Sequence, residues 1–144
     1  MDIGGDMYAC GAPEGYEGWP IEVENPLDGA AITTIVARDM AVMTSGVDYR
    51  RWQAEDGSLR HHIINPKTGA CAETDVLAVT IAHPEATLAE AYTKAVLILG
   101  SNTGLGWLSS RWQGAAFVIR QDGAVLATSD FISFISSSSF DGGN

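Results

Sequence analysis

The sequence predicts an α+β fold, in which a mostly antiparallel sheet is followed by two helices late in the chain. Short apolar or alternating segments separated by Gly, Pro and Asp-Gly turns fill the first 82 residues, whereas helical spacing of apolar residues begins only after Pro84. A length of 144 residues fits one domain, and a hydrophobic content of 46% excludes a disordered chain. One folded domain is therefore expected.

The charge balance restricts the classes of partner. The chain has 18 acidic and 8 basic side chains, a net charge of −10, and its basic residues are scattered, with Arg50-Arg51 the only adjacent pair. Such a chain repels a phosphate backbone, so no nucleic-acid partner is expected. No apolar run is long enough for a membrane span, and Met1–Asp6 shows no signal peptide. Cys10 and Cys71 are expected to be free thiols, and they leave the compartment unknown.

The first elements are short strands. An apolar stretch at 7–10 is followed by an alternating segment at 19–26, bracketed by prolines, that predicts a half-buried strand. A β-branched run predicts the next strand at 30–38. A third strand is expected at 41–43, ending at Thr44-Ser45-Gly46.

A hairpin is predicted next. Segments 49–54 and 58–64 flank Glu55-Asp56-Gly57, and an Asp-Gly pair supplies the positive φ angles of a tight turn. Residues 65–69, with Asn, Pro and Gly, end this hairpin as a loop. The apolar run 76–82 predicts a strand that is buried on both faces.

The helical part follows. Pro84 is placed at the N1 position of a helix whose apolar stripe is expected on one side, and Gly100 is predicted to end it. The stripe consists of Leu88, Ala91, Tyr92, Ala95, Val96 and Leu99. A shorter helix is expected at 101–111. A last hairpin is predicted from 115–120 and 124–128, and residues 136–144 form a mobile Ser/Gly tail after a domain at 1–135.

The densest polar cluster lies at 60–69. Adjacent histidines in a strand point to opposite sides, so at most one of His61 and His62 can reach a given site. An imidazole where a strand becomes a loop is rigidly placed, open to ligand and suited to proton transfer near neutrality. The alternative is a surface hairpin with solvated histidines, and the residues alone leave both open.

Two further segments are candidate anion sites. Gly4-Gly5-Asp6 and Thr44-Ser45-Gly46 offer backbone N–H groups, hydroxyls and glycines to a phosphate, and either is equally compatible with an ordinary turn. On the predicted helix, Glu90 and Lys94 are four residues apart in the favourable order for a surface ion pair of about 0.2–0.5 kcal/mol.

Taken in order, these segments resemble the C-terminal portion of the FAD:protein FMN transferase (ApbE-like) family. The resemblance covers residues 3–128, and its most specific string is His61-His62-Ile63-Ile64-Asn65-Pro66-Lys67-Thr68-Gly69. It implies the C-terminal half of the ApbE-like (T-fold-like) domain. It also implies FAD as substrate, a target flavoprotein that accepts FMN on a Ser or Thr hydroxyl, and usually Mg²⁺. The alternative is a pseudoenzyme that binds FAD or FMN, or a structural subunit, in either case without transfer activity.

The resemblance also implies site residues. His62 matches the functional histidine and would be the base for the acceptor hydroxyl. The flavin nucleotide and its phosphates would be contacted at seven positions: Gly5, Asp6, Thr44, Ser45, Gly46, Ile63 and Ile64. The positive potential that a pyrophosphate needs would come from Arg60, Lys67 and Lys94.

Two departures from the family follow. Glu90 and Lys94 stand where the family has a metal-binding Asp and Thr; a glutamate still suits a cation, whereas protonated lysine repels it and can only replace it electrostatically. The chain begins inside the Gly-Gly-Asp motif, which implies a fragment, a degenerate relative or a chain that pairs with a complementary N-terminal chain or another copy. The family acts at the periplasmic face of the inner membrane.

Overall fold

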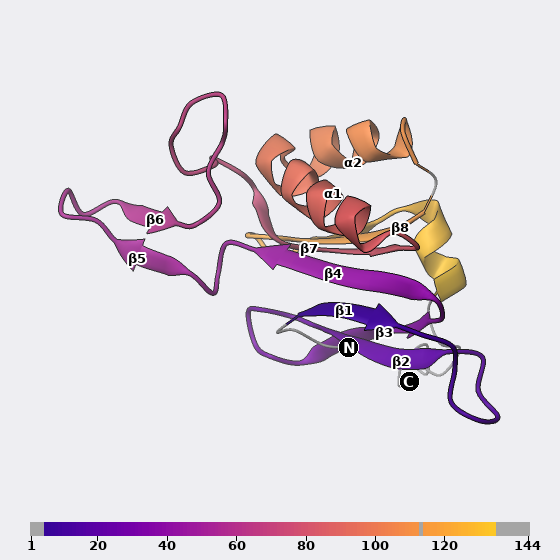
Figure 1. Ribbon diagram of the computed structural model, residues 1–144. Helices are drawn as coiled ribbons and strands as arrows, with labels where there is room; N and C mark the ends of the chain where they lie inside the picture. The colour runs from indigo at the N-terminus through magenta and orange to yellow at the C-terminus, as the bar shows by residue number, and fades with distance from the viewer. Residues whose placement is uncertain (1–4, 113, 135–144) are drawn as a thin grey trace.

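The structure is a computed structural model that describes residues 5–112 and 114–134. Its main element is a five-stranded antiparallel sheet (Figure 1). Its strand order is β1-β4-β7-β8-β9, and every pair of neighbours is antiparallel. The strands span Asp6–Ala9 (β1), Met40–Gly46 (β4), Val76–His83 (β7), Ala115–Arg120 (β8) and Val125–Ala127 (β9). The predicted α+β class with a mostly antiparallel sheet is thus confirmed.

Two layers cover this sheet. Helices α1 (Ala86–Leu99) and α2 (Ser101–Ser109) lie on one face, and the hairpin of β2 (Trp19–Glu24) and β3 (Ala31–Ala37) lies on the other side (Figure 1). A 3₁₀ helix, η1 (Ser129–Phe134), which the sequence did not predict, follows β9 and packs on β8. None of the described helices is long and apolar enough to cross a membrane.

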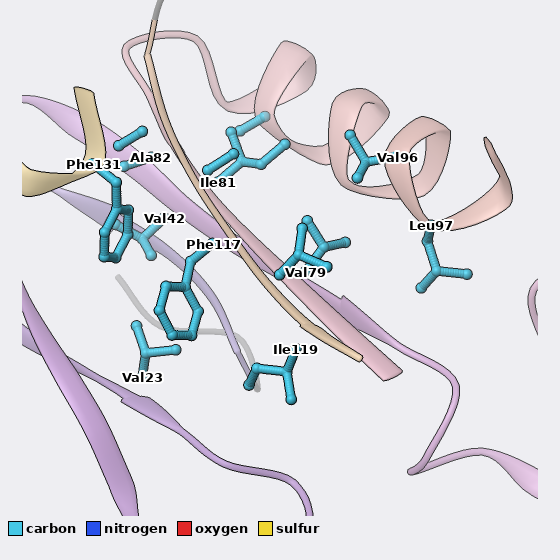
Figure 2. Packing of buried hydrophobic residues seen from close by; sticks show 14 of the residues in the cluster. Val23, Val42, Val79, Ile81, Ala82, Val96, Leu97, Phe117, Ile119 and Phe131 are labelled. Carbon is cyan, nitrogen blue, oxygen red and sulfur yellow. The ribbon is translucent and has the colours of Figure 1, made fainter. Parts of the chain in front are cut away.

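Strand β7 lies at the centre of the core. All eight of its residues are buried, as its continuous apolar run predicted for a strand covered on both faces. Val96 and Leu97 of α1 lie on the helix side, whereas Phe117 and Val23 fill the opposite side (Figure 2). The Phe117 ring also packs on Phe131 of η1 at a centroid distance of 5.0 Å, so that one core joins all three layers.

Helix α1 differs from its prediction in start and in phase. The helix begins at Ala86 with Glu85 as its N-cap, two residues after the predicted N1 position at Pro84, because the backbone N–H of Glu85 donates to Nδ1 of His83 at 2.8 Å and holds both residues in a turn. The residues that it buries are Ala89, Thr93, Val96 and Leu97, whereas Leu99 is exposed. Gly100 ends the helix at a φ of +83°, as predicted.

Helix α2 and both Asp-Gly hairpins are found where the sequence predicts them, with shorter bounds. Helix α2 ends at Ser109, and the first hairpin is reduced to β5 (Arg51–Gln53) and β6 (Leu59–His61). In its turn only Gly57 has a positive φ, because Oδ1 of Asp56 accepts the N–H of Ser58 and closes a three-residue loop. Asp122, Gly123 and Ala124 repeat this arrangement in the second hairpin.

Cys10 and Cys71 are both free, as expected. Gly4 and the predicted tail at 136–144 lie outside the residues that the structure describes.

Candidate functional site

The predicted histidine site lies on a segment that projects from the body of the molecule (Figure 1). We call residues 49–72 the arm: it consists of β5, β6 and the loop that returns to β7. In the part of the chain that the structure describes, β5 and β6 pair only with each other. The arm therefore presents both of its outer strand edges and most of its side chains to solvent.

The two adjacent histidines have different surroundings. His61 is half-buried; its Nδ1 accepts the backbone N–H of Ile63 at 3.3 Å, and its Nε2 lies 3.1 Å from the carbonyl oxygen of Ala72. Because Nδ1 accepts, the ring proton is on Nε2 and is donated to Ala72. The side chain of His62 is exposed. Of the two, His62 is the imidazole that a ligand can reach.

The loop after His62 is tied to itself by backbone hydrogen bonds. The N–H of Asn65 donates to Ala70 at 2.9 Å, and its side-chain oxygen accepts the N–H of Lys67 at 3.0 Å. Ile63 is buried, whereas Ile64 is exposed and pairs through its backbone with Cys71. The buried Ile63 side chain anchors the loop and leaves that of Ile64 turned outward.

The two candidate anion sites lie next to each other. In the register of β1 and β4, Asp6 is opposite Met43, which puts Gly5 and Asp6 beside Met43 and Thr44. Thr44, Ser45 and Gly46 are the last residues of β4, paired with β7, and do not form a turn as the alternative proposed. The register alone brings these distant segments together.

The hydroxyls of β4 are already hydrogen-bonded. Thr93 Oγ1 donates to the carbonyl of Glu90 at 2.9 Å, so Ser45 must be the donor in the buried 2.8 Å bond between Ser45 Oγ and Thr93 Oγ1. Thr44 is bonded to Thr80 Oγ1 at 2.9 Å. The sequence analysis missed Thr80 and Thr93. The signal available for Thr80 was a threonine inside the otherwise apolar run 76–82, whereas Thr93, next to Lys94, gave no such signal.

Gly46 is closely packed at the end of β4. A Cβ at this position would meet Oδ1 of Asp48 and would lie 3.1 Å from the carbonyl oxygen of Leu77. The chain turns here from β4 into the arm, with the N–H of Val47 donating to Leu77 at 2.9 Å. The closely packed glycine thus lies where the chain leaves the sheet towards the arm.

The expected metal position is an ion pair. The Lys94 ammonium donates to Oε1 of Glu90, whereas Oε2 is shielded from solvent without a hydrogen-bond partner among the described residues. No group of three His, Cys, Asp or Glu side chains within residues 5–112 and 114–134 is arranged to hold a metal ion. Glu90 and Lys94 thus form the ion pair that the sequence predicted.

An aromatic cluster on the helix layer was not predicted. The His83 ring lies 4.6 Å from that of Trp112 and 5.8 Å from that of Tyr92, which also contacts Trp107 at 5.6 Å. Trp112 lines a shallow cavity of about 230 Å³ together with Ser109, Gly114, Thr128, Ser129 and Asp130. None of the predicted site residues lines this cavity.

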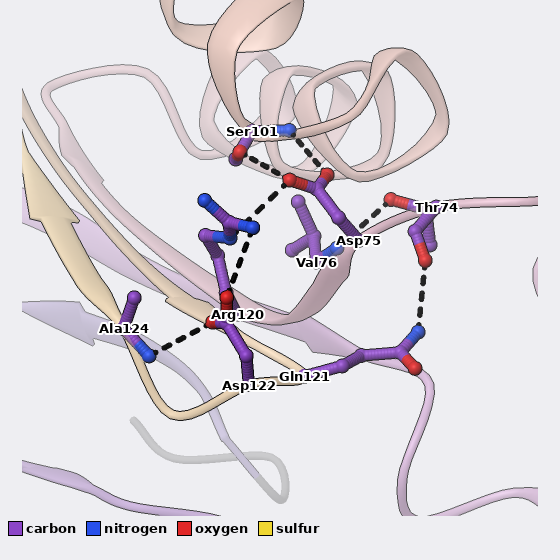
Figure 3. Close-up of polar contacts among 8 residues, drawn as sticks. All are labelled: Thr74, Asp75, Val76, Ser101, Arg120, Gln121, Asp122 and Ala124. Carbon is purple, nitrogen blue, oxygen red and sulfur yellow. Dashed lines mark hydrogen bonds and ion pairs between the residues drawn. The ribbon is translucent and has the colours of Figure 1, made fainter.

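A polar network fixes α2 to the sheet (Figure 3). Asp75 accepts from the backbone N–H of Ser101 at 2.8 Å and from its hydroxyl at 2.5 Å, and pairs with Arg120 Nε at 3.4 Å. The hydrogen bonds from Ser101 hold the pKa of Asp75 below its usual value. On the arm, the Ser58 hydroxyl and N–H, aided by Arg60, lower the pKa of Asp56 to about 2.

The chain is similar to proteins of a known family. The model of the ApbE family matches residues 1–119. A FAD:protein FMN transferase of Treponema pallidum is 36% identical over 111 residues, 69% of this chain and 30% of that protein. One from Vibrio cholerae is 27% identical over 140 residues, 94% of this chain and 42% of that protein. The chain thus spans less than half of these curated relatives.

Solved structures of ApbE proteins are also similar to this chain. The ApbE protein of Thermotoga maritima superposes with a TM-score of 0.80 at 29% identity, covering 94% of this chain and 44% of that one. The flavin transferase ApbE from Vibrio cholerae gives a TM-score of 0.74 at 29% identity, covering 92% and 43%. With a family match over most of its length, the chain belongs to the ApbE family.

Proposed function

We propose that this chain takes part in transferring FMN from FAD to a Ser or Thr hydroxyl of a target flavoprotein. The match to the ApbE family over residues 1–119, which contain the whole arm, carries the proposal. The matched curated relatives are named FAD:protein FMN transferase, which favours transfer over flavin binding alone or a purely structural role. The proposed partners are FAD, the acceptor flavoprotein and a polypeptide, a second copy included, that supplies the rest of the relatives' length.

His62 is proposed as the base. The acceptor hydroxyl oxygen attacks the FMN phosphorus of FAD, forming one P–O bond, while the bond from that phosphorus to the bridging oxygen breaks and AMP leaves. The hydroxyl proton passes to His62, whose exposed ring an acceptor can approach. The geometry of the loop supports this role, because His61 and Asn65 hold the backbone on both sides of His62.

FAD is proposed to bind between the arm and the ends of β1 and β4. Gly5 and Asp6 lie beside Thr44, and Gly46 leads directly into the arm. The backbone of Ile63 and Ile64 completes the proposed contacts. Ser45 is proposed to act indirectly, because its hydroxyl donates to Thr93 inside the protein.

The residues present do not fit Mg²⁺. The family places a cation at the position of Glu90, and here the Lys94 ammonium already binds one oxygen of that carboxylate. A divalent ion would lie beside a positive charge with one side-chain ligand, whereas Mg²⁺ requires near-octahedral oxygen coordination. We therefore assign no step to a metal.

The test is mass spectrometry of a Ser-containing acceptor after incubation with FAD. The wild-type protein should add one FMN to the acceptor and release AMP. His62→Gln should lower the transfer rate by about 10²–10⁴-fold, the usual contribution of a positioned base, and leave FAD affinity unchanged. Gln53→Ala, on the same hairpin, is the control. Bound FAD without any transfer by the wild type would contradict the proposal.

A further inference from the structure

The arm has a surface chemistry opposite to that of the rest of the molecule. Residues 49–72 contain four of the chain's eight Lys and Arg but only two of its 18 acidic residues, so the arm is net positive in a chain of charge −10. It also exposes large apolar side chains: Tyr49 at 94%, Leu59 at 64%, Trp52 at 51% and Ile64 at 46%. Exposed aromatic and arginine side chains are the types enriched where proteins bind other proteins.

Trp52 and two arginines of the arm share a face with the proposed base. Trp52 and Arg60 are directly opposite each other in the β5–β6 register. Two positions further towards the body, beyond the pair Arg51 and His61, Arg50 is opposite His62, and the N–H of His62 donates a 3.2 Å hydrogen bond to the carbonyl of Arg50. Since alternate pairs point to the same side of a hairpin, Arg50, Trp52, Arg60 and His62 belong to one face. We call these four residues the His62 face.

The charges on this face differ in how they are compensated. Arg60 pairs with Asp56 at 3.1 Å, within its own hairpin. For Arg50, the described residues place no carboxylate within ion-pair distance. Arg50 thus retains an unneutralised positive charge beside His62, with Trp52 next to it.

We propose that the His62 face is the docking surface for the acceptor polypeptide, and that this partner carries acidic residues close to its target Ser or Thr. The inference rests on the proposed function, because the acceptor hydroxyl must reach His62. An acidic segment is attracted to Arg50, and the negative body repels it from other approaches. The outer edges of β5 and β6, which pair with no other strand in the described part of the chain, also offer backbone groups to an extended segment.

Two synthetic peptides test this proposal. They share a central Ser and differ only in flanking residues, Asp in one and Lys in the other. The KM for FMN transfer should be about tenfold lower for the Asp-flanked peptide at low salt, and the difference should shrink as ionic strength rises. Arg50→Glu should remove this preference with little change in kcat or in the KM for FAD, and Arg50→Ala should reduce it. Arg38→Glu makes the same charge change at an exposed residue in the β3–β4 turn and should leave the preference for the Asp-flanked peptide unchanged.

Several results would overturn the inference. Equal KM values for the two peptides would exclude an acidic partner. A rise in the KM for FAD in Arg50→Glu would show that the His62 face binds the pyrophosphate instead. If Arg50→Glu changes only the sedimentation behaviour of the protein, the His62 face is an interface between copies of this chain. If the wild type transfers no flavin, fluorescence-polarisation binding of the two peptides still decides the inference independently of the proposed function.

Discussion

The Nε2–H group of His61 donates to the carbonyl oxygen of Ala72 across the base of the loop that follows His62. This histidine is therefore a structural part of the site. His61→Leu removes this bond and the one from Ile63, and hydrogen exchange at the Ile63 amide should become up to about tenfold faster, the effect expected of one hydrogen bond. In His61→Gln, which can still donate to Ala72, the exchange rate at Ile63 should lie between those of the wild type and His61→Leu. Equal exchange in all three proteins would contradict this role.

Two glycines of α2 should respond in opposite directions to alanine. A Cβ at Gly104 would lie 2.6 Å from the carbonyl oxygen of Val96 in α1, so Gly104→Ala should lower the free energy of unfolding by about 1–3 kcal/mol. At Gly106 no atom lies within 4 Å of the added Cβ, and alanine should raise stability by about 0.5–1 kcal/mol. Urea denaturation measures both, and a destabilised Gly106→Ala would show that helix propensity does not govern this position.

The Asp75–Ser101 contact should make stability depend on pH. Because the folded state lowers the pKa of Asp75, its stabilisation is present above the unfolded pKa near 4 and is lost as the pH falls through the folded pKa. Asp75→Asn should reduce the free energy of unfolding by about 1–2 kcal/mol at pH 7, and this difference should shrink in acid. Glu73→Gln controls for net charge. A pH-independent difference would contradict the linkage.

Replacing Lys94 should create a cation site. In Lys94→Thr the Glu90 carboxylate loses its ammonium partner and gains a neighbouring hydroxyl. Millimolar Mg²⁺ or Mn²⁺ should then raise the Tm of Lys94→Thr but not that of the wild type, because an ion that binds only the folded state stabilises it. Adding Glu90→Gln should remove the effect. A Glu90-dependent Tm rise in the wild type would show that Lys94 does not exclude the metal.

Much of the fold could be predicted because its signals are local. The continuous apolar run of β7, the two Asp-Gly turns and Gly100 each act within a few residues, and the structure has all four where they were expected. The start of α1 could not be predicted in this way, since it depends on a hydrogen bond from Glu85 to the His83 ring. The burial of Thr93 could not be predicted either, since its hydroxyl is hydrogen-bonded to Ser45, 48 residues earlier in the chain.

The site was predictable only in part. Strand alternation indicates that His61 and His62 point to different sides, but the contact that identifies His61 as the inward one involves Ala72, 11 residues away. The adjacency of Gly5 and Thr44 is a matter of strand register. Local sequence does not define that register, because it depends on which segments pair across the whole sheet.

The arm's isolation from the main sheet has a consequence for its local stability. A two-stranded hairpin is at best marginally stable in water, and in the described part of the chain β5 and β6 have no third strand. Opening of β5 and β6 would break few contacts of the core, so this segment should unfold locally while β4 and β7 remain paired. The conformation of the arm would then change while the three layers keep their cooperative stability.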